Sequence, residues 1–315
     1  MDEFDLIARY FAPLAARADD IVLGIGDDAA LLRTPPGATL AVAVDTLVAG
    51  VHVPHDCAPA ALGYRVAAVN LSDLAAMGAR PRFATLALTL ETAAAAWLEA
   101  FAAGLASALA PAGVALVGGD TTRGPLCVTL QLLGWAPEVP LRRDGARVGD
   151  HVLVSGTLGD ARAALDLLGQ AAADADQAWL LERYYRPTPR LALGQALAGL
   201  AHAAIDVSDG LVADLGHVAR ASGVAIDVEL ERLPLSPALR RHAGDGAARC
   251  AAAGGDDYEL AFTVAAADRG RVIEQAAALG VTVTDVGRVV AGAGVRCRDA
   301  DGRDQAAELA GYRHF

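Results

Sequence analysis

Six short segments of the sequence place aspartate beside glycine, serine or threonine, and several of them adjoin strongly apolar runs. They are GIGDDA (24–29), VDTLVAGVH (44–52), NLSDLAAMGA (70–79), GGDTTRG (118–124), IDVSDG (205–210) and GGDDYEL (254–260). Any single segment of this kind indicates only a turn or a helix N-cap, where Asp, Ser and Gly are preferred. Six of them in one chain favour a common task for their carboxylates.

Binding of hard divalent cations is the chemistry that these residue types suit best. Mg²⁺ takes oxygen ligands, usually one or two carboxylates together with phosphate oxygens. A cation would also let the adjacent carboxylates of Asp27 and Asp28 coexist. Neighbouring side chains of an extended chain point to opposite sides. We therefore expect one of the two to bind metal and the other to cap a backbone group or pair with an arginine. The flanking glycines would let the backbone approach a phosphate closely.

The composition limits where positive charge for a phosphate could come from. The chain of 315 residues has a net charge of −12 and contains no lysine. A P-loop and a protein-kinase strand lysine are therefore excluded, since both motifs need that residue. The acidic balance also argues against a nucleic-acid partner, because a phosphate backbone binds a basic face. Metal ions and arginines must supply the positive charge if the protein binds a nucleotide.

The sequence predicts neither a membrane segment nor an oxidising compartment. Its apolar runs fall short of the ~20 residues that span a bilayer. The first residues, MDEFDLIARYF, lack the basic and apolar regions of a signal peptide. The four cysteines lie far apart and form no CxxC pair, so we expect neither a zinc site nor a disulfide framework. A cytoplasmic location without a membrane partner follows as an expectation.

Hydrophobic periodicity and the positions of Gly and Pro predict strands and helices in both halves of the chain. Helices are expected at about 2–11, 59–77, 93–110 and 267–279, and strands at 39–44, 82–90, 114–117, 126–135, 151–155, 224–230 and 283–290. The stretch 136–150 is rich in Pro, Gly and charge and is expected to link two domains, at 1–137 and 149–315. We therefore expect a two-domain α/β or α+β enzyme with aspartates at strand ends.

Taken together, the six segments, their order and their spacing resemble those of the thiamine-monophosphate kinase family. That family lies within the superfamily of aminoimidazole ribonucleotide synthetase, selenophosphate synthetase and the hydrogenase-maturation dehydratase. The likeness runs from FDLIARYF near the N-terminus to the terminal GYRHF, which is nearly the whole chain. The other members of the superfamily also have Asp-Gly segments, but their residues differ from those in this sequence.

The resemblance implies an activity and a fold. The family transfers the γ-phosphoryl group of ATP directly to the phosphate of thiamine monophosphate and forms thiamine diphosphate, the last step of thiamine diphosphate biosynthesis. Several Mg²⁺ ions assist, and K⁺ is a further candidate. The implied aminoimidazole ribonucleotide synthetase-like fold has an N-terminal domain that forms a homodimer through a shared β-barrel, and a C-terminal α/β domain. The active site is expected in the cleft between the two domains.

Carried over position by position, the resemblance also implies site residues. The Mg²⁺ ligands would be Asp28, Asp45, Asp73, Asp120, Asp206 and Asp209. The ATP contacts would be Gly119, Asp120, Arg143 and Ser208, and the thiamine phosphate contacts would be His52, Asp256 and Tyr312. No general base is expected, because the attacking phosphate oxygen is already anionic and phosphoryl transfer depends mainly on positioning and charge.

The sequence departs from the family pattern at a few positions. Ala43 and Val44 precede Asp45 where relatives often carry Ser or Thr, so a hydroxyl ligand is lost there. Val53 follows His52 where Phe is common, which implies a less aromatic substrate pocket. Asp256 stands where Glu is frequent, so the carboxylate reaches one methylene less far.

Other functions stay open from the sequence alone. A different ATP-dependent member of the superfamily, such as an aminoimidazole ribonucleotide synthetase, would activate an amide oxygen instead of extending a phosphate. A non-enzyme could keep the fold and bind metal or nucleotide in regulation. Selenophosphate synthetase is disfavoured because no Cys or Lys lies in an N-terminal glycine-rich loop, and the hydrogenase-maturation protein because the chain has no Cys-bearing tail.

Single residues also have plain structural interpretations. His52 would be an ordinary strand-end histidine, Arg143 a surface ion-pair partner and Tyr312 a packed core residue. Asp214, one turn into the helix expected after IDVSDG, is predicted to be a surface carboxylate near the positive end of the helix dipole.

Overall fold

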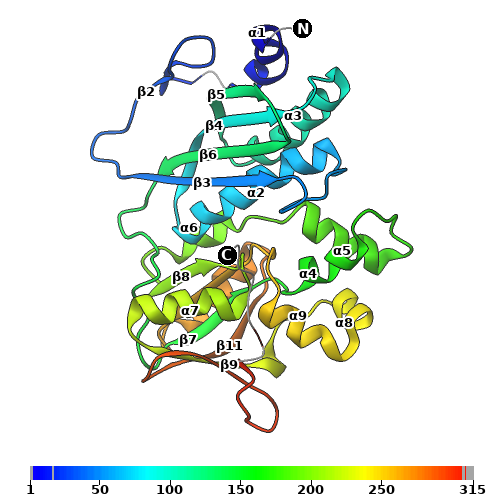
Figure 1. Cartoon of the computed structure of the whole chain (residues 1–315). Helices are drawn as coiled ribbons and strands as arrows, with labels where there is room; N and C mark the ends of the chain where they lie inside the picture. Colours follow the sequence, from blue (N-terminus) through cyan, green and yellow to red (C-terminus); the bar gives the residue numbers. More distant parts are fainter. Residues whose placement is uncertain (1–2, 16–17, 307–308, 310–315) are drawn as a thin grey trace. The chain divides into compact units, whose positions relative to one another are not determined.

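The protein consists of two compact units that both combine strands with helices (Figure 1). The structure, a computed structural model, describes residues 3–15, 18–306 and 309. The first unit comprises residues 1–74 and 79–136, and the second comprises 75–78 and 137–315. None of the helices within the described ranges has the length and apolar character needed to cross a bilayer. The expected α/β class is confirmed for each unit.

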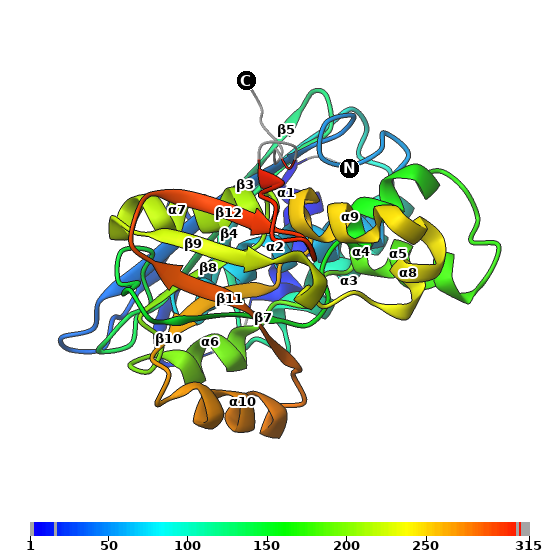
Figure 2. The same ribbon diagram turned by 90° about the horizontal axis from the view of Figure 1, so that it is seen from below.

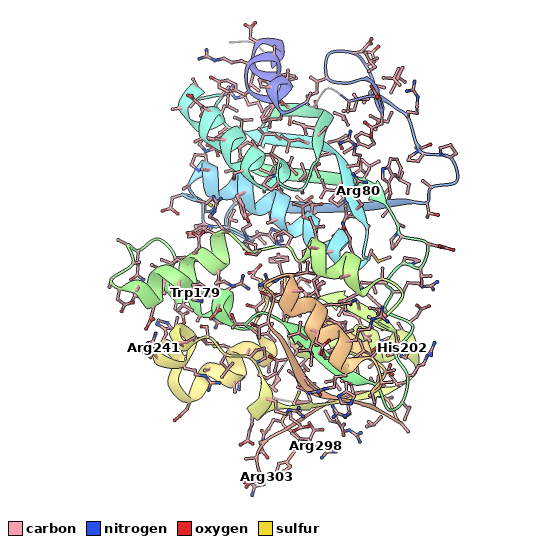
Figure 3. The ribbon with its side chains drawn as sticks, turned by 180° about the vertical axis from the view of Figure 1, so that it is seen from behind. Arg80, Trp179, His202, Arg241, Arg298 and Arg303 are labelled. Atoms are coloured by element: carbon pink, nitrogen blue, oxygen red, sulfur yellow. The ribbon has the colours of Figure 1, made fainter. Side chains whose placement is uncertain are left out.

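A four-stranded sheet in the order β3-β6-β4-β5 forms the first unit. Its strands are β3 (Leu40–Val48), β4 (Arg80–Leu90), β5 (Ala115–Arg123) and β6 (Cys127–Trp135). β6 runs antiparallel to β3 and β4, whereas β5 is parallel to β4. Helices α2 (Pro59–Ala76) and α3 (Ala95–Leu109) cover one face, which lies behind the sheet in Figure 1 and in front of it in Figure 3.

Side chains of this sheet alternate between the covered face and an open one. On β6, Val128, Leu130 and Leu132 are fully buried. On β3, the alternate positions Leu40, Val42 and Val44 are exposed, with 43–57% of their surface accessible. An apolar strip therefore remains uncovered along β3 in the described residues.

A short β-ribbon holds the GIGDDA loop. β1 (Ile21–Leu23) and β2 (Leu31–Leu32) pair antiparallel, and Ile21 and Leu32 pack on a small core around Phe83. The guanidinium of Arg82 donates to both carboxylate oxygens of Asp20 at 2.6 Å, which ties the start of the ribbon to β4. The loop between β1 and β2 is thus anchored at its base.

Helices α2 and α3 of the first unit cross at a glycine contact. A Cβ on Gly104 would lie 2.0 Å from the carbonyl oxygen of Ala60, and a Cβ on Gly63 would lie 2.2 Å from that of Phe101. No larger residue fits without moving backbone. This crossing fixes α2, the helix that carries Asp73.

The second unit contains a six-stranded sheet in the order β12-β9-β11-β7-β10-β8. Its strands are β7 (His151–Ser155), β8 (Ala203–Asp206), β9 (Ala225–Glu229), β10 (Leu260–Val264), β11 (Val283–Val290) and β12 (Gly294–Arg298). Neighbouring strands are antiparallel except β9 and β12, which are parallel. β8 leads into the IDVSDG segment and β10 follows the GGDDYEL segment, and these two strands pair directly.

Helices cover both faces of the second sheet (Figure 2). They are α6 (Leu191–Leu197), α7 (Leu211–Ser222) and α10 (Arg269–Ala278). Leu215 of α7 belongs to the core that contains Val154, whereas Leu197 of α6 and Val272 of α10 belong to the core around Phe262. A satellite core joins four short helices, α4 (Asp160–Ala164), α5 (Ala175–Tyr185), α8 (Pro237–Ala243) and α9 (Ala247–Ala253).

Two strands are longer than expected, and this changes where the aspartates lie. β3 was expected to end at residue 44 but pairs with β6 as far as Val48, so Asp45 lies inside the strand. β5 was expected to end at 117 but pairs with β4 through Arg123, because one extra residue at Val117 shifts the register and lets the ladder continue. Asp120 therefore also lies inside a strand, and the strand-end prediction is wrong for these two residues.

The glycine crossing of α2 and α3 makes a stability prediction. We expect Gly104→Ala to lower the free energy of unfolding by about 1–3 kcal/mol, because the added methyl overpacks the crossing. Gly216→Ala in α7 is the matched control, since nothing lies within 4 Å of its Cβ position. That control should raise the free energy of unfolding by about 0.5–1 kcal/mol through helix propensity. Urea unfolding measures both, and equal effects would contradict the crossing.

Candidate active site

A cavity of about 550 Å³ in the first unit lies between the GIGDDA loop and the GGDT segment of β5. The polar residues and glycines that line it are Gly24, Gly26, Asp27, Asp28, Thr85, Gly118, Gly119, Asp120 and Thr121. Apolar residues such as Phe11 and Leu116 complete the wall. Glycine-rich backbone and carboxylates in one concave site form the kind of surface that binds a metal–phosphate group.

The two adjacent aspartates of the loop differ in what they bond. The Asp27 carboxylate accepts the backbone N–H of Asp28 at 2.8 Å. Asp27 thereby holds the turn, as expected for one member of the pair. Asp27, Asp28 and Asp120 all line the cavity.

Gly119 is required by the packing of β5 on β4. Its φ is +155°, and a Cβ there would lie 1.9 Å from the carbonyl oxygen of Leu86. Any side chain would therefore collide with the neighbouring backbone. The absence of side chains at Gly118 and Gly119 keeps this wall of the cavity open.

Asp45 and Asp73 form a second pair of acidic residues in the first unit. The Asp45 side chain on β3 shares a hydrogen bond with that of Asp73 on α2. Burial raises the pKa of Asp45, and the hydrogen bond from Asp73 only partly opposes this rise. Two carboxyl groups in contact need either a shared proton or a bound cation. These two residues are not part of the wall of the cavity described above.

His52 lies in the turn after β3. Its Nδ1 accepts the backbone N–H of Val48 at 3.0 Å. The neutral ring therefore carries its proton on Nε2. Val53, the neighbour expected to shape the substrate pocket, is buried.

In the second unit the IDVSDG and GGDDYEL segments lie side by side. The backbone N–H of Asp256 donates to Ser208 O, and that of Tyr258 donates to Val207 O, both at 2.8 Å. These bonds extend the β8–β10 ladder, in which Asp206 pairs with Leu260. A Cβ on Gly255 would lie 2.3 Å from Ser208 O, so only glycine permits this approach. The structure thus places the segments that carry Asp206, Ser208, Asp209 and Asp256 next to each other.

Asp256 and Tyr258 adopt an unusual backbone conformation. Their φ angles are +70° and +52°, in the left-handed region that side chains other than glycine rarely occupy. The Tyr258 hydroxyl donates to the Asp256 carboxylate at 3.2 Å. Backbone strain of this kind persists only where the surrounding contacts impose it, and it is common at functional sites.

Asp214 is buried, so the prediction of a surface carboxylate is wrong. Only 2% of its surface is exposed, and its Oδ2 accepts the backbone N–H groups of Ser208, Asp209 and Gly210 at 3.0–3.1 Å. Burial raises its pKa to about 7, and the negative charges of Asp206 and Asp209 add to the rise. The reason for the burial is the turn before α7, whose unpaired N–H groups need an acceptor. Asp214 therefore shapes the IDVSDG loop.

The remaining two predicted ligand contacts are Arg143 and Tyr312. Arg143 is exposed, and its carbonyl oxygen accepts the Ser222 hydroxyl at 2.9 Å. Tyr312 lies outside the described residues.

A buried network around Glu259 was not predicted from the sequence. Two signals of it were available: the pattern RPTPR (186–190) and a glutamate at the start of a fully buried strand.

The acidic residues fit Mg²⁺ only as partial sites. Among the described residues, no three His, Cys, Asp or Glu side chains lie close enough to hold a metal ion by themselves. Mg²⁺ usually needs only one or two carboxylates and completes its shell with water and phosphate oxygens. The Asp45–Asp73 pair and the carboxylates of Asp28 and Asp120 in the cavity meet that requirement.

Comparison with known proteins gives independent evidence. Residues 26–136 match the family model described as AIR synthase related protein, N-terminal domain, and residues 147–300 match AIR synthase related protein, C-terminal domain. A thiamine-monophosphate kinase of Salmonella typhimurium is 48% identical over 318 residues, which cover 99% of this chain and 98% of that protein.

Solved structures agree with the sequence matches. The crystal structure of thiamine-monophosphate kinase from Stenotrophomonas maltophilia is 48% identical, with a TM-score of 0.89 over 96% of this chain and 98% of its own. The structure named "AaThiL complexed with AMPPCP and TMP" is 35% identical, with a TM-score of 0.80 over 99% of this chain and 97% of its own.

Two variants of the buried Asp214 separate the effect of its acceptor oxygen on stability from the effect of its charge. In Asp214→Ala, three backbone N–H groups lose their acceptor, and we expect the free energy of unfolding to fall by about 1–3 kcal/mol or more. Asp214→Asn keeps one carbonyl oxygen and should cost about 1 kcal/mol or less. Urea unfolding of the two variants tests this. An Asn variant as unstable as the Ala variant would show that the charge, and not the acceptor oxygen, matters.

Proposed function

The chain belongs to the thiamine-monophosphate kinase family of AIR synthase related proteins, and we propose that it transfers the γ-phosphoryl group of ATP to thiamine monophosphate. The product is thiamine diphosphate, so the enzyme catalyses the last step of that synthesis. The observation that carries this conclusion is 48% identity over almost the full length of kinases of this name. A relative that is 35% identical is complexed with AMPPCP and TMP, which supports ATP and thiamine monophosphate as the two substrates.

We assign the phosphate groups of ATP to the cavity of the first unit. Gly119 leaves its backbone open to a close approach, and Asp120 lies beside it. Ser208 and Arg143 are the proposed further ATP contacts. Arginine suits this role because its planar fork matches phosphate oxygens and keeps its charge.

We propose that Mg²⁺ is held by Asp28, Asp45, Asp73, Asp120, Asp206 and Asp209. When bound, Mg²⁺ neutralises charge on the phosphate oxygens and so lets two anions approach. The chain's own task is to orient these carboxylates, which α2 does for Asp73 and the Asp214-bound loop does for Asp209. Several ions are proposed, and K⁺ is a further candidate.

The acceptor is proposed to bind at His52, Asp256 and Tyr312. The Nε2–H of a neutral His52 is a donor suited to a phosphate oxygen, and the Asp256 carboxylate is held by the Tyr258 hydroxyl at 3.2 Å. The attacking atom is a phosphate oxygen that is anionic at neutral pH, so no side chain has to remove a proton. Positioning then supplies most of the rate enhancement.

A homodimer and a cytoplasmic location complete the proposal. The exposed strip Leu40, Val42 and Val44 lies on the open face of the first sheet. An apolar sheet face of this kind needs cover, and a second copy that closes the two sheets into a barrel would provide it. All four cysteines are free, as expected in a reducing compartment.

A coupled assay of ADP release tests the proposed reaction. Thiamine monophosphate should support turnover, whereas thiamine and an aminoimidazole ribonucleotide precursor should not. Chromatography should identify thiamine diphosphate as the product. Turnover with the aminoimidazole precursor would identify a different member of the superfamily, and ATP binding without turnover on any acceptor would identify a regulatory binding protein.

Carboxylate variants test the metal assignment. Asp73→Asn and Asp120→Asn should lower kcat by orders of magnitude while the fold is kept, because charge neutralisation at the phosphates is lost. Asp73→Asn should also lose the rise in melting temperature that Mg²⁺ gives the native protein. Asp56→Asn, which changes an exposed carboxylate of the same unit, is the control. Normal turnover of the first two variants at saturating Mg²⁺ would refute the assignment.

The adjacent pair allows a finer comparison. Asp27→Asn keeps an oxygen that can accept the Asp28 N–H, so it should reduce kcat less than Asp28→Asn does. Steady-state kinetics at several Mg²⁺ concentrations measure the difference. The reverse ranking would show that Asp27 is the metal ligand.

A further inference from the structure

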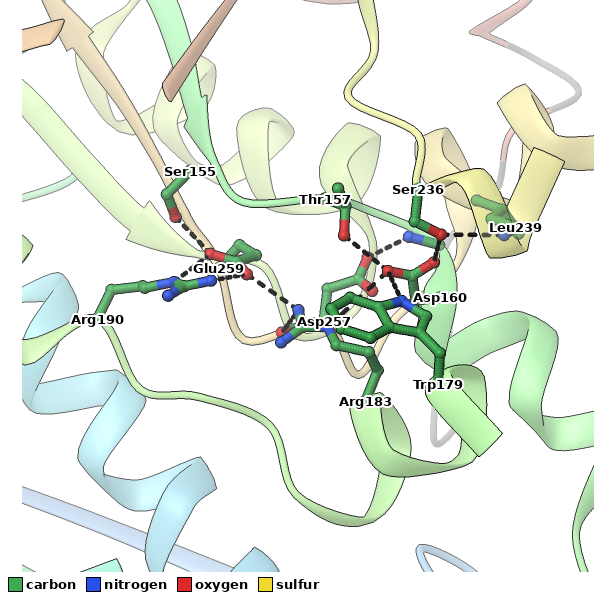
Figure 4. A network of polar contacts seen from close by, with 11 residues as sticks. Ser155, Thr157, Asp160, Trp179, Arg183, Arg190, Ser236, Leu239, Asp257 and Glu259 are labelled. Carbon is green, nitrogen blue, oxygen red and sulfur yellow. Dashed lines mark hydrogen bonds and ion pairs between the residues drawn. The ribbon is translucent and has the colours of Figure 1, made fainter. Parts of the chain in front are cut away.

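A buried network of charges in the second unit has no role in the proposed chemistry (Figure 4). It joins Asp160, Asp257 and Glu259, each at most 1% exposed, to the guanidinium groups of Arg183 and Arg190. Charged groups in such places are costly, because their attraction must compensate for the loss of hydration. Well-packed apolar residues would often stabilise a fold as much, so stability alone is a weak reason for this network.

Glu259 is the centre of the network. Its carboxylate accepts both Nε and Nη2 of Arg190 at 2.6 Å, Nη2 of Arg183 at 2.9 Å and the Ser155 hydroxyl at 2.6 Å. Gly156 borders it so closely that a Cβ there would lie 2.1 Å from Glu259 Oε1. The carboxylate therefore has one position and no room to move.

The same groups hold the strained turn that carries Asp256. Arg183 Nη2 also donates to the carbonyl oxygen of Asp257 at 3.2 Å, inside the turn. From the other side, the backbone N–H of Gly159 donates to the Asp257 carboxylate at 2.7 Å. Left-handed backbone at a residue other than glycine costs about 1–3 kcal/mol and persists only when its surroundings impose it. The Arg183 and Glu259 contacts meet that need.

Charge counting separates Asp257 from Glu259. The network contains three carboxyl groups but two guanidinium groups, so one carboxyl group is in surplus. Asp257 bonds neither guanidinium through its carboxylate, and burial raises its pKa well above the ordinary range. The Asp257 carboxylate therefore binds a backbone N–H, whereas the Glu259 carboxylate faces both arginines.

We propose that Glu259 is a positioning residue: with Arg183 and Arg190 it fixes the turn Asp256–Tyr258 and so aims the Asp256 carboxylate at the acceptor. The inference rests on the proposed role of Asp256 in binding thiamine monophosphate. Its signature is a larger effect on the acceptor than on ATP. Of the ATP contacts proposed above, Ser208 touches this turn, and it does so through its carbonyl oxygen, which accepts the Asp256 N–H at 2.8 Å.

Arg190→Gln is the main test, because Arg190 is the least buried member, with 18% of its side chain exposed. We expect KM for thiamine monophosphate to rise about tenfold or more, as a displaced positioning group commonly causes. KM for ATP should stay within about twofold. Glu259→Gln should act in the same direction and more strongly. Asp257→Asn keeps an oxygen that can accept the Gly159 N–H, so it should change KM for thiamine monophosphate less than Arg190→Gln does.

Arg241→Gln is the matched control. Arg241 (labelled in Figure 3) binds Asp176 with the same two-pronged geometry, Nε and Nη2 at 2.6 Å, but this pair joins α8 to α5 and the Arg241 side chain is exposed. It should change neither KM value. A purely structural network would behave differently: Arg190→Gln would lower the melting temperature and the yield of active enzyme but leave both KM values as in the native chain.

The outcomes separate this inference from the proposed function. If the native enzyme releases no ADP with thiamine monophosphate, the proposed function fails first. If the native enzyme is active and folded Arg190→Gln keeps its KM for thiamine monophosphate, or if KM for ATP rises equally, the positioning role is refuted. Should Glu259→Gln not fold, Arg190→Gln and Asp257→Asn still decide the question.

Discussion

Repulsion between like charges is the constraint on which both units depend. Asp45 and Asp73 touch, and Asp214 lies buried near the charges of Asp206 and Asp209. The chain relieves the cost differently in each place. Three backbone N–H groups bind Asp214, and two guanidinium groups bind Glu259, whereas Asp45 and Asp73 share a hydrogen bond. The fold thus supplies donors to the carboxylates that shape loops, and it brings two carboxyl groups into contact where a shared proton or a cation is needed.

Glycine sets the geometry wherever two backbones must approach. Gly119 brings β5 against the carbonyl of Leu86 beside the cavity, and Gly255 brings the GGDDYEL segment against Ser208. Gly104 does the same between α2 and α3, which places Asp73. In each case a single methyl group would collide with backbone, so the acidic residues next to these glycines keep their positions only while the glycines are present.

The sequence was a better guide to which segments form the candidate site than to the contacts that each side chain makes. Local apolar periodicity located β7, β11 and α2 almost to the residue, because those elements depend on short-range patterns. The lengths of β3 and β5 were misjudged because the cross-strand ladder, and not the local sequence, determines where each strand ends. The burial of Asp214 and the ion pairs of Glu259 were missed for a related reason. The backbone amides that bind Asp214 and the arginines that bind Glu259 come close to them only in the folded chain.

The complete absence of lysine explains how the charges are divided. A buried lysine can lose its charge, whereas arginine keeps its charge and offers several donors at fixed angles. The second unit uses this property to bind Glu259 and Asp285, each of which is contacted by more than one arginine. Arginines bound in this way have fewer donors left for phosphates. This is why we propose that a chain with a net charge of −12 that brings two phosphate groups together takes most of the required positive charge from bound cations.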